Sequence, residues 1–410
     1  MGQSWTIGAQ LSTSHSSSSI LSLDGVVDVV ERTRSIIDLD ILIVGARENP
    51  TIFRAMCNPA RRPAKEVFLW YNVLSDIEGM QESDLVVNWR GERSRGWGGW
   101  AENEAEVHET FRFVCPNNPA AKEKTLGRLR ELLDRYPFDG VFLDKMRFPS
   151  PANGLNEVFS CFCDHCRRTA STLGLDLDVV ARSFQEPFLP GGGSPAARGD
   201  GGAKSWLDEL VASNPLLSAF LRFRSDSITR LIAEAYNAAS RLGRKVSLDL
   251  FSPGLASVVG QDYRALSRYS VWAKPMTYRV AMGPAGLRLE VPALVEGVAA
   301  MFGLSESRIA DWASVHVPDF NSDTLRLTRE SAVPLSIMRA EIADAVRSMR
   351  PAPVYFGLEL VSHPGVIDIT PALVTDMVGA GREAGAAGTI ISWDLMHAPV
   401  NGLEALAAAV

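Results

Sequence analysis

The sequence predicts an α/β fold, a single (β/α)8 barrel over residues 1–410, and three observations support this prediction. Short apolar segments typical of buried parallel strands alternate with longer segments of helical periodicity along the chain. Eight such strand segments can be assigned, which is the number that closes a barrel of this type. Acids, bases and aromatic residues follow most of these segments, as expected where barrel strands end at an active site.

Each element is assigned from its local pattern. The predicted strands are rich in β-branched and aromatic residues, and the predicted helices carry apolar residues at three- and four-residue spacing. Strands are expected at residues 5–9, 40–45, 66–72, 140–143, 245–250, 269–276, 353–360 and 388–394. Helices are expected at residues 23–37, 48–57, 120–136, 207–242, 325–349, 371–384 and 402–410. This alternation indicates a parallel sheet covered by helices.

Two connections are too long for ordinary βα loops, so the barrel is predicted to carry long insertions after its third and fourth strands. The first, residues 73–110, contains Trp89, Trp97 and Trp100, whose rings either form a wall of a binding site or anchor the loop to the barrel. The second, residues 150–206, contains a cysteine cluster and a segment rich in glycine and proline. It is interpreted as a loop excursion within the barrel because the alternation of strands and helices resumes after it.

Composition and charge exclude several classes of protein. The chain has 46% hydrophobic and 22% charged residues, typical of a globular protein, and its net charge of −7 without a basic stripe argues against nucleic acid as a partner. No run of about 18 apolar residues predicts a membrane span. Residues 1–10 lack the pattern of a secretory signal, so the cytoplasm is the expected location. No organic cofactor is expected, and the sequence does not determine the oligomeric state.

Residues 138–149 contain the strongest candidate site. The apolar strand in this segment ends abruptly at Asp144 and Arg147, and the alternative is a β-turn with solvated charges. The other predicted strands, beginning with those that end at Gln10 and Arg47, also carry polar or aromatic side chains that would meet at one mouth of the barrel. The residues expected to bind a substrate at this mouth are Tyr71, Asn72, Arg147, Asp249, Lys274, Tyr278, Trp393 and Asp394.

Paired carboxyl groups and aromatic walls at such a mouth favour glycoside hydrolysis. One carboxyl group protonates the leaving oxygen, while the other attacks the anomeric carbon or activates water. Asp144 and Glu359 end strands that lie across the predicted barrel from each other, so they are the predicted catalytic pair. Arg147 would keep Asp144 ionised, and the apolar neighbours of Glu359 would raise its pKa and make it the proton donor. The reverse assignment of the two roles stays open.

Four segments resemble a known group of proteins. Phe-Asp-Gly-Val-Phe-Leu-Asp-Lys-Met-Arg-Phe-Pro at residues 138–149 resembles the signature of glycoside-hydrolase-like TIM-barrel proteins, and residues 114–119, 161–166 and 274–278 also resemble segments of that group. The resemblance implies the barrel fold, glycosidase activity on a carbohydrate or glycoconjugate, and a substrate-binding role for Asn117. The best-known retaining barrels carry Asn-Glu where this chain has Leu143 and Asp144, whereas some sugar-hydrolysing barrels use an aspartate there as nucleophile.

The cysteines predict a metal site. Three of them form a C-x-C-x-x-C pattern and a fourth lies on an adjacent element, so that four thiolates are available: Cys161, Cys163, Cys166 and Cys115. Four thiolates make a closed tetrahedral zinc site of the structural kind. The pattern resembles the zinc site of some β-galactosidase barrels, which implies one structural zinc per chain. The alternatives are free thiols or a site in which His165 replaces one thiol, and Cys57 is expected to belong to the core.

Two other functions stay open. Lys274 ends the sixth predicted strand, where class I aldolases of barrel fold have their Schiff-base lysine, so the first alternative is a lyase. The second is a non-catalytic barrel that binds carbohydrate, because fold does not imply function. A metal-dependent hydrolase fits poorly, since the six histidines are scattered instead of gathered at strand ends.

Overall fold

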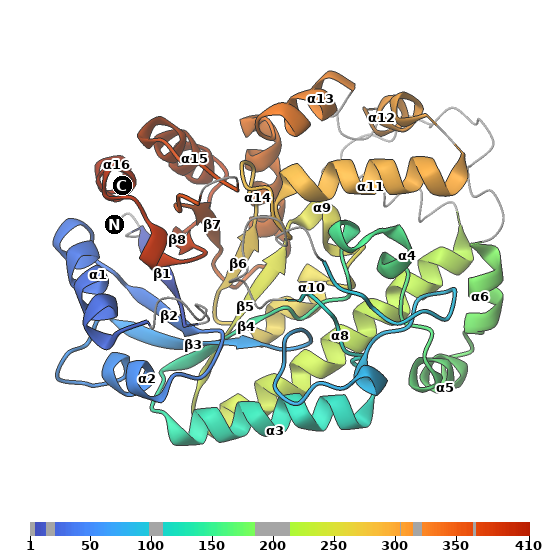
Figure 1. Ribbon diagram of the computed structural model, residues 1–410, viewed down its shortest axis with the longest axis horizontal. Helices are drawn as coiled ribbons and strands as arrows, with labels where there is room; N and C mark the ends of the chain where they lie inside the picture. Colours follow the sequence, from blue (N-terminus) through green and yellow to red (C-terminus); the bar gives the residue numbers. More distant parts are fainter. Residues whose placement is uncertain are drawn as a thin grey trace.

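The computed structural model describes residues 5–13, 21–97, 110–184, 214–303, 305–314, 322–363 and 366–410. Within these ranges, eight parallel strands form a nearly closed barrel and helices surround it (Figure 1), which confirms the predicted (β/α)8 fold. Trp100 and the predicted segment rich in glycine and proline lie outside the described residues.

The strands of the barrel are β1 (Thr6–Ser12), β2 (Ile41–Gly45), β3 (Glu66–Asn72), β4 (Gly140–Asp144), β5 (Lys245–Phe251), β6 (Ala273–Met276), β7 (Tyr355–Glu359) and β8 (Gly388–Ser392). Hydrogen bonding places them in the order β6-β5-β4-β3-β2-β1-β8-β7. Between β6 and β7 the described residues form a parallel bridge from Ala273 to Val354. Pro275 within β6 has no amide N–H, so this strand cannot form a full ladder with both neighbours.

Helices cover the outside of the barrel, and several begin at an asparagine cap followed by proline. Asn49, Asn118 and Asn214 each accept a backbone N–H of the first helical turn, as sequence rules for helix starts predict. The helices are α1 (Leu23–Ile36), α2 (Pro50–Met56), α3 (Pro119–Arg135), α4 (Leu155–Val158), α5 (Asp164–Thr172), α6 (Leu177–Ser183), α8 (Pro215–Arg241), α9 (Pro253–Ala256), α10 (Tyr263–Leu266), α11 (Leu287–Phe302), α12 (Glu306–Ser314), α13 (Ser322–Glu330), α14 (Leu335–Ser348), α15 (Pro371–Glu383) and α16 (Val400–Ala409).

The inside of the barrel is filled with aromatic rings. Phe142 stacks on Trp272 with ring centroids 5.4 Å apart, and Phe68 meets Trp272 edge-on at 5.3 Å. Gly140 provides the room for this packing, because a Cβ atom there would lie 2.4 Å from the ring of Phe68. The barrel is therefore a packed core and not a pore, and polar groups at its carboxyl end rest on an apolar floor.

Three predicted elements differ from the structure. The helix predicted at residues 325–349 is two helices, α13 and α14, because Pro334 cannot donate a helical hydrogen bond and the chain breaks before it. The strand predicted at 269–276 begins only at Ala273, since Tyr269 ends the 3-10 helix η3 (Ser267–Tyr269) and residues 270–272 form an irregular bend before the strand. Residues 5–9 extend further than predicted, because β1 continues to Ser12.

The insertion after β4 is more regular than a simple loop. Its described part forms the 3-10 helix η2 (Pro151–Asn153) and helices α4, α5 and α6. Leu155 and Val158 of α4 join an apolar cluster with Leu294 and Val298 of α11, which lies over this side of the barrel (Figure 1). None of the helices described has both the length and the apolar composition needed to cross a bilayer.

Candidate active site

The strand ends form a ring of polar side chains above the aromatic floor. Because side chains alternate between the two faces of a strand, Phe142 and Asp144 point into the barrel and Leu143 points toward the helices. The inward-facing residues at the strand ends have exposed fractions of 7% or less, and they are Gln10, Asn72, Asp144, Asp249, Lys274, Glu359 and Ser392. The structure thus confines carboxylates, a cation and amides to one small volume.

Asp144 at the end of β4 is held by two N–H donors. The indole Nε1 of Trp70 donates to its Oδ2 at 2.8 Å, and the backbone amide of Lys145 donates to its Oδ1 at 2.5 Å. Donors of this kind stabilise the charged carboxylate and fix its orientation. Asp144 keeps an exposed fraction of 7%, against 2% for Asp249 and none for Glu359. Of these three carboxylates, Asp144 is therefore the most accessible to a substrate.

Asp249 and Lys274 form a buried ion pair on the adjacent strands β5 and β6. Lys274 Nζ lies 2.9 Å from Asp249 Oδ2, and it also donates to Gln10 Oε1 at 2.7 Å and to the Tyr278 hydroxyl at 2.9 Å. Ser392 Oγ is a fourth and more distant acceptor at 3.4 Å, so acceptors are present for all three protons of the ammonium group. Burial lowers the pKa of Lys274, but Asp249, Tyr278 and Asp144 together raise it above its ordinary value. Lys274 is therefore held in its charged form.

Asp249 differs from Asp144 in its second carboxylate oxygen. Its Oδ1 is buried and has no hydrogen-bond partner among the described residues. Burial raises the pKa of Asp249 well above its usual range, the negative charge of Asp144 adds to this rise, and the Lys274 ammonium opposes it. An oxygen without a donor in a group of raised pKa is a suitable place for a proton. The two aspartates thus differ in their hydrogen bonds: both oxygens of Asp144 accept an N–H, whereas only one oxygen of Asp249 has a partner.

Arg147 is enclosed by two aromatic rings. Its guanidinium carbon lies 4.5 Å from the ring centroid of Phe113 and 4.7 Å from that of Phe251. Its Nη1 donates to the carbonyl oxygen of Phe148, so Asp144 acts on Arg147 through charge. Burial lowers the pKa of Arg147 to about 10, which still leaves the side chain charged at neutral pH. The cation thus lies beside the mouth.

A second buried ion pair supports Asp144, and the sequence did not indicate it. Asp76, which follows β3, lies 2.8 Å from Lys145 Nζ, and both residues have left-handed backbones with φ of 54° and 51°. Asp76 Oδ1 also accepts the amide and hydroxyl of Thr110. Burial raises the pKa of Asp76, but Lys145 lowers it to about 2. The pair holds the Lys145 amide where it can donate to Asp144, and it ties both ends of the β3–α3 connection to β4.

Glu359 is bound to the backbone that follows β6. Its carboxylate accepts the amides of Arg279 at 2.7 Å, Val280 at 3.1 Å and Ala281 at 2.7 Å. Burial raises the pKa of Glu359, and the three amide donors oppose this rise because they favour the ionised form. These contacts suit a carboxylate that organises the chain between β6 and α11, and they leave it poorly arranged to donate a proton.

Glu359→Gln is expected to lower the free energy of unfolding by about 1–3 kcal/mol, because the amide NH2 would face a backbone donor and leave it without an acceptor in the core. Urea denaturation measures this change, with Glu404→Gln on the exposed face of α16 as the control. Turnover at saturating substrate is expected to change little. A variant with wild-type stability and no turnover would instead support Glu359 as the proton donor predicted from the sequence.

The other predicted site residues divide into two groups. Trp393 lies beside Tyr278 with ring centroids 6.1 Å apart, and Asp394 accepts the amides of Ser12 and Met396, so both belong to the mouth. Tyr71 faces α3, where its hydroxyl donates to the carbonyl oxygen of Thr125.

Asn117 also lies away from the mouth. Its side chain donates to Ser227 Oγ at 3.0 Å and to Cys166 Sγ at 3.4 Å, so it belongs to the surroundings of the cysteines. In the β3–α3 connection, Trp89 packs on Phe184 at 6.0 Å and Trp97 on Phe111 at 6.0 Å. These contacts favour anchoring of the connection over a wall of the binding site.

The four predicted cysteine ligands are gathered at one point. The Sγ atoms of Cys115, Cys161, Cys163 and Cys166 all lie within 4.8 Å of one another, and none of them forms a disulfide. Cys115 Sγ is 3.4 Å from that of Cys166 and 3.5 Å from that of Cys163. Tetrahedral coordination with bonds of about 2.3 Å places sulfurs about 3.8 Å apart, so the cluster fits a closed four-thiolate metal site. His165 is not part of it, since its Nδ1 contacts Arg168.

Comparison with solved structures relates this barrel to glycoside hydrolases. The glycoside hydrolase domain of PgaB (BpsB) from Bordetella bronchiseptica matches with a TM-score of 0.56 and 12% identity, over 96% of this chain and 95% of that one. α-L-Fucosidase isoenzyme 2 from Paenibacillus thiaminolyticus matches with a TM-score of 0.52 and 11% identity, over 99% of this chain and 49% of that one. No family model and no curated protein sequence matches the chain.

The likeness establishes the fold. It confirms the barrel fold that the resemblance at residues 138–149 implied, and it covers nearly the whole chain. At 11–12% identity it does not assign catalytic residues to this chain.

Proposed function

We propose that the protein is a glycoside hydrolase that cleaves O-glycosidic bonds of a carbohydrate or glycoconjugate, with Asp144 as the carboxylate at the reacting bond. The observation that carries this proposal is that the Trp70 indole and the Lys145 amide each donate a hydrogen bond to Asp144 and so fix its orientation. Asp144 lies at the carboxyl end of β4, where barrel enzymes have their active sites. Solved structures of the same fold include a glycoside hydrolase domain and a fucosidase, which supports a carbohydrate substrate.

The second carboxyl group in this proposal is Asp249. A glycosidase needs one ionised carboxylate and one protonated carboxyl group at the scissile bond. The sequence pairs Asp144 with Glu359, but both carboxylate oxygens of Glu359 already accept backbone amides, whereas Asp249 Oδ1 has no donor among the described residues and is free to carry a proton. Glu359 then acts as the group that positions the segment between β6 and α11.

The reaction follows from these two environments. Asp249 transfers its proton to the leaving glycosidic oxygen as the bond from that oxygen to the anomeric carbon breaks. In one route Asp144 bonds to the anomeric carbon, and water then displaces it from that carbon. In the other route Asp144 removes a proton from a water molecule, and this water attacks the anomeric carbon. Retention or inversion of the product's anomeric configuration distinguishes these two routes. Arg147 and Lys274 keep positive charge beside both carboxyl groups.

Release of reducing ends from a panel of neutral, amino and acidic polysaccharides tests the proposal, and its pH dependence tests the roles. A proton donor must be protonated, so kcat/KM is expected to fall as pH rises through the raised pKa of Asp249, above the usual range of a carboxyl group. Asp249→Asn should abolish this fall of kcat/KM at high pH together with most of the activity. Glu359→Gln should keep both the activity and its fall at high pH. No release of reducing ends from any member of the panel would contradict the hydrolase assignment and favour a barrel that only binds carbohydrate.

The lyase alternative is opposed by the contacts of Lys274. A Schiff-base lysine needs a depressed pKa so that a neutral amine can attack a carbonyl group. Here the Asp249 carboxylate and the Gln10 and Tyr278 oxygens stabilise the ammonium form. Borohydride in the presence of pyruvate should therefore give no covalent adduct on Lys274, and a trapped adduct detected by mass spectrometry would restore the lyase reading.

We further propose that the metal held by the cysteine cluster is zinc, with a structural role. All four ligands are thiols, which suit zinc, and together they leave no open coordination position. The cluster joins Cys115, just before α3, to the segment that carries α5, so bound metal would fix the insertion onto the barrel. Cys57 lies apart, at the C-terminal cap of α2, and is half-buried, which makes it a matched control.

Protein purified without chelator is expected to contain about one zinc per chain by inductively coupled plasma mass spectrometry. Cys163→Ser should lose most of this zinc and lower the unfolding temperature, because metal binding energy contributes to folding. Cys57→Ser should keep the wild-type metal content. Wild-type protein without metal, or equal zinc in both variants, would contradict the assignment.

A further inference from the structure

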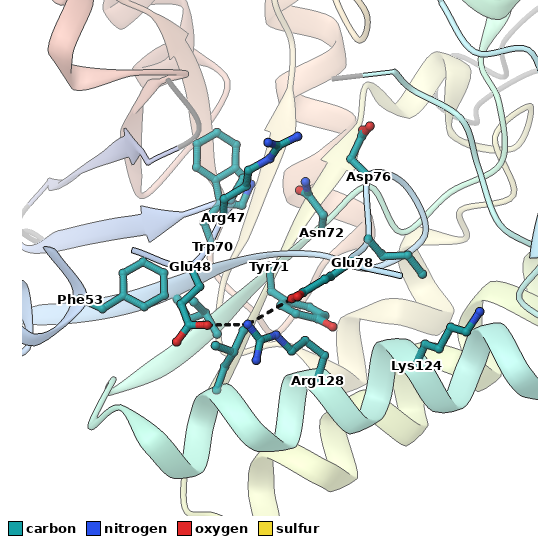
Figure 2. A pocket seen from close by; sticks show the side chains of 14 residues that line it. Arg47, Glu48, Phe53, Trp70, Tyr71, Asn72, Asp76, Glu78, Lys124 and Arg128 are labelled. Atoms are coloured by element: carbon teal, nitrogen blue, oxygen red, sulfur yellow. Dashed lines mark hydrogen bonds and ion pairs between the residues drawn. The ribbon is translucent and has the colours of Figure 1, made fainter. Parts of the chain in front are cut away.

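A cavity of about 430 Å³ lies beside the mouth of the barrel, on the side of β2 and β3 (Figure 2). Its walls come from the end of β3, from the residues that follow β2 and β3, and from the facing sides of α2 and α3. The volume falls in the range of about 300–1,000 Å³ that is usual for small-molecule sites. Its position next to the carboxyl ends of the strands is where barrel enzymes bind their substrates.

The cavity shares a wall with Asp144. Trp70 lines it, and the indole of this residue donates to Asp144 Oδ2. Asn72 also lines it and is the direct strand neighbour of Asp144 in the pairing of β3 with β4. Asp76 completes this wall and holds Lys145 through the buried ion pair. A ligand in the cavity would therefore lie one residue layer from the carboxylate at the proposed reacting bond.

The charges of the cavity balance one another. Arg47, Lys124 and Arg128 face Glu48, Asp76 and Glu78. Figure 2 shows Arg128 bridging Glu48 and Glu78, with N–O distances of 2.5 and 3.2 Å. Lys124 is paired with Asp84 at 2.6 Å, and Asp76 with Lys145 at 2.8 Å. A ligand here meets polar groups of both signs and no net charge, which suits hydroxyl groups and disfavours an anion.

Asn72 gives the cavity a specific polar contact. Its Oδ1 has no hydrogen-bond partner among the described residues, and its exposed fraction is 6%. A buried carbonyl oxygen without a donor costs free energy, so its retention beside a cavity indicates a donor from a ligand. The rings of Trp70 and Phe53 and the side chain of Leu132 add apolar surface of the kind on which a sugar ring packs.

We propose that this cavity is a subsite for an uncharged sugar unit, next to the unit cleaved at Asp144, so that the substrate is a neutral oligosaccharide or polysaccharide. The inference rests on the proposed glycosidase function and specifies its substrate class. A hydroxyl group of the bound unit donates to Asn72 Oδ1, and the ion-paired side chains of the wall accept and donate the remaining hydrogen bonds. A single sugar unit cannot occupy both this cavity and the position at Asp144.

Binding to the Asp144→Asn variant tests the subsite separately from turnover. The probes are oligomers of glucose and of N-acetylglucosamine from monomer to hexamer, with oligogalacturonides as the anionic comparison, titrated by calorimetry. At least one neutral series is expected to bind more tightly as it lengthens beyond the monomer. Ala46→Phe, which fills the cavity from its partly exposed wall, should weaken binding of the longer oligomers by about tenfold or more, and Asn72→Ala by about two- to tenfold.

Arg54→Ala is the matched control, because Arg54 lies on the exposed side of α2. It should leave every dissociation constant unchanged. Four results would each overturn the subsite: equal affinity for monomer and hexamer, tighter binding of the oligogalacturonides, no binding of either neutral series, or no effect of Ala46→Phe and Asn72→Ala.

If the wild-type protein cleaves a polysaccharide while one of these results is obtained, the subsite fails and the hydrolase assignment stands. If length-dependent binding is lost in Ala46→Phe but no polysaccharide is cleaved, the subsite stands and the hydrolase assignment fails.

Discussion

Asp144→Asn is expected to lower kcat on a cleaved polysaccharide by about 10²–10⁴-fold, the contribution usual for a positioned acid, base or nucleophile. The substitution keeps the size of the side chain and one oxygen that can accept from Trp70 or Lys145. It removes the negative charge that attacks the anomeric carbon or activates water. Reducing-end release under saturating substrate measures the loss, and circular dichroism verifies that the variant is folded.

Asp226→Asn provides the control for this variant, because Asp226 is an exposed aspartate on the outer helix α8. Its kcat should equal that of the wild type. If Asp144→Asn retained wild-type kcat, the carboxylate of Asp144 would have no part in the reaction, and the proposed mechanism would have to be abandoned.

Lys274→Met is expected to lower the free energy of unfolding by about 1–3 kcal/mol, because the buried oxygens of Asp249, Gln10 and Tyr278 lose the donor that Lys274 provides. Methionine preserves the length of the side chain, so little packing is lost. Asp249 Oδ2 and Gln10 Oε1 would both stay in the core without this donor. Urea denaturation of both proteins at neutral pH measures the difference.

A double variant separates charge from packing in this pair. Lys274→Met combined with Asp249→Leu replaces both ionic groups by apolar side chains, and such replacements are often neutral or stabilising. The double variant should therefore be more stable than Lys274→Met, although inactive if Asp249 is the proton donor. A double variant as unstable as the single one would show that Lys274 acts mainly through packing and through its contacts with Gln10 and Tyr278.

Local pattern was sufficient to locate Asp144 but not the groups that hold it. A charge that interrupts the apolar run of residues 140–143 marks the point where a buried strand must end. Asp76 and Lys145 are 69 residues apart in the chain and look like ordinary solvated charges. Their buried pairing depends on how the connection after β3 folds back over β4, and no local periodicity carries this information.

The sequence pattern also did not show which side chains of each strand point into the barrel. Residues 66–72 are apolar on both faces of the strand, because the barrel interior covers one face and α3 the other. In the structure, alternation places Trp70 and Asn72 inside the barrel and Tyr71 against the helix. The sequence does not show which of these two alternating sets faces the interior. Both Tyr71 and Asn72 were therefore expected at the mouth; Asn72 lies there, whereas Tyr71 faces α3 and lines the cavity beside the mouth.

The alternation of apolar strands and amphipathic helices is a local property, so it was readable along the chain and predicted eight strands, a barrel and a carboxyl-end site. The cysteine spacing was readable for the same reason, since three of the four ligands lie close together in the sequence, at residues 161–166. The contacts of Glu359 with the amides after β6, the Asp249–Lys274 pair and the cavity beside Trp70 join residues far apart in sequence. Such contacts exist only after the strands close into a ring, because burial and charge pairing are properties of the folded chain.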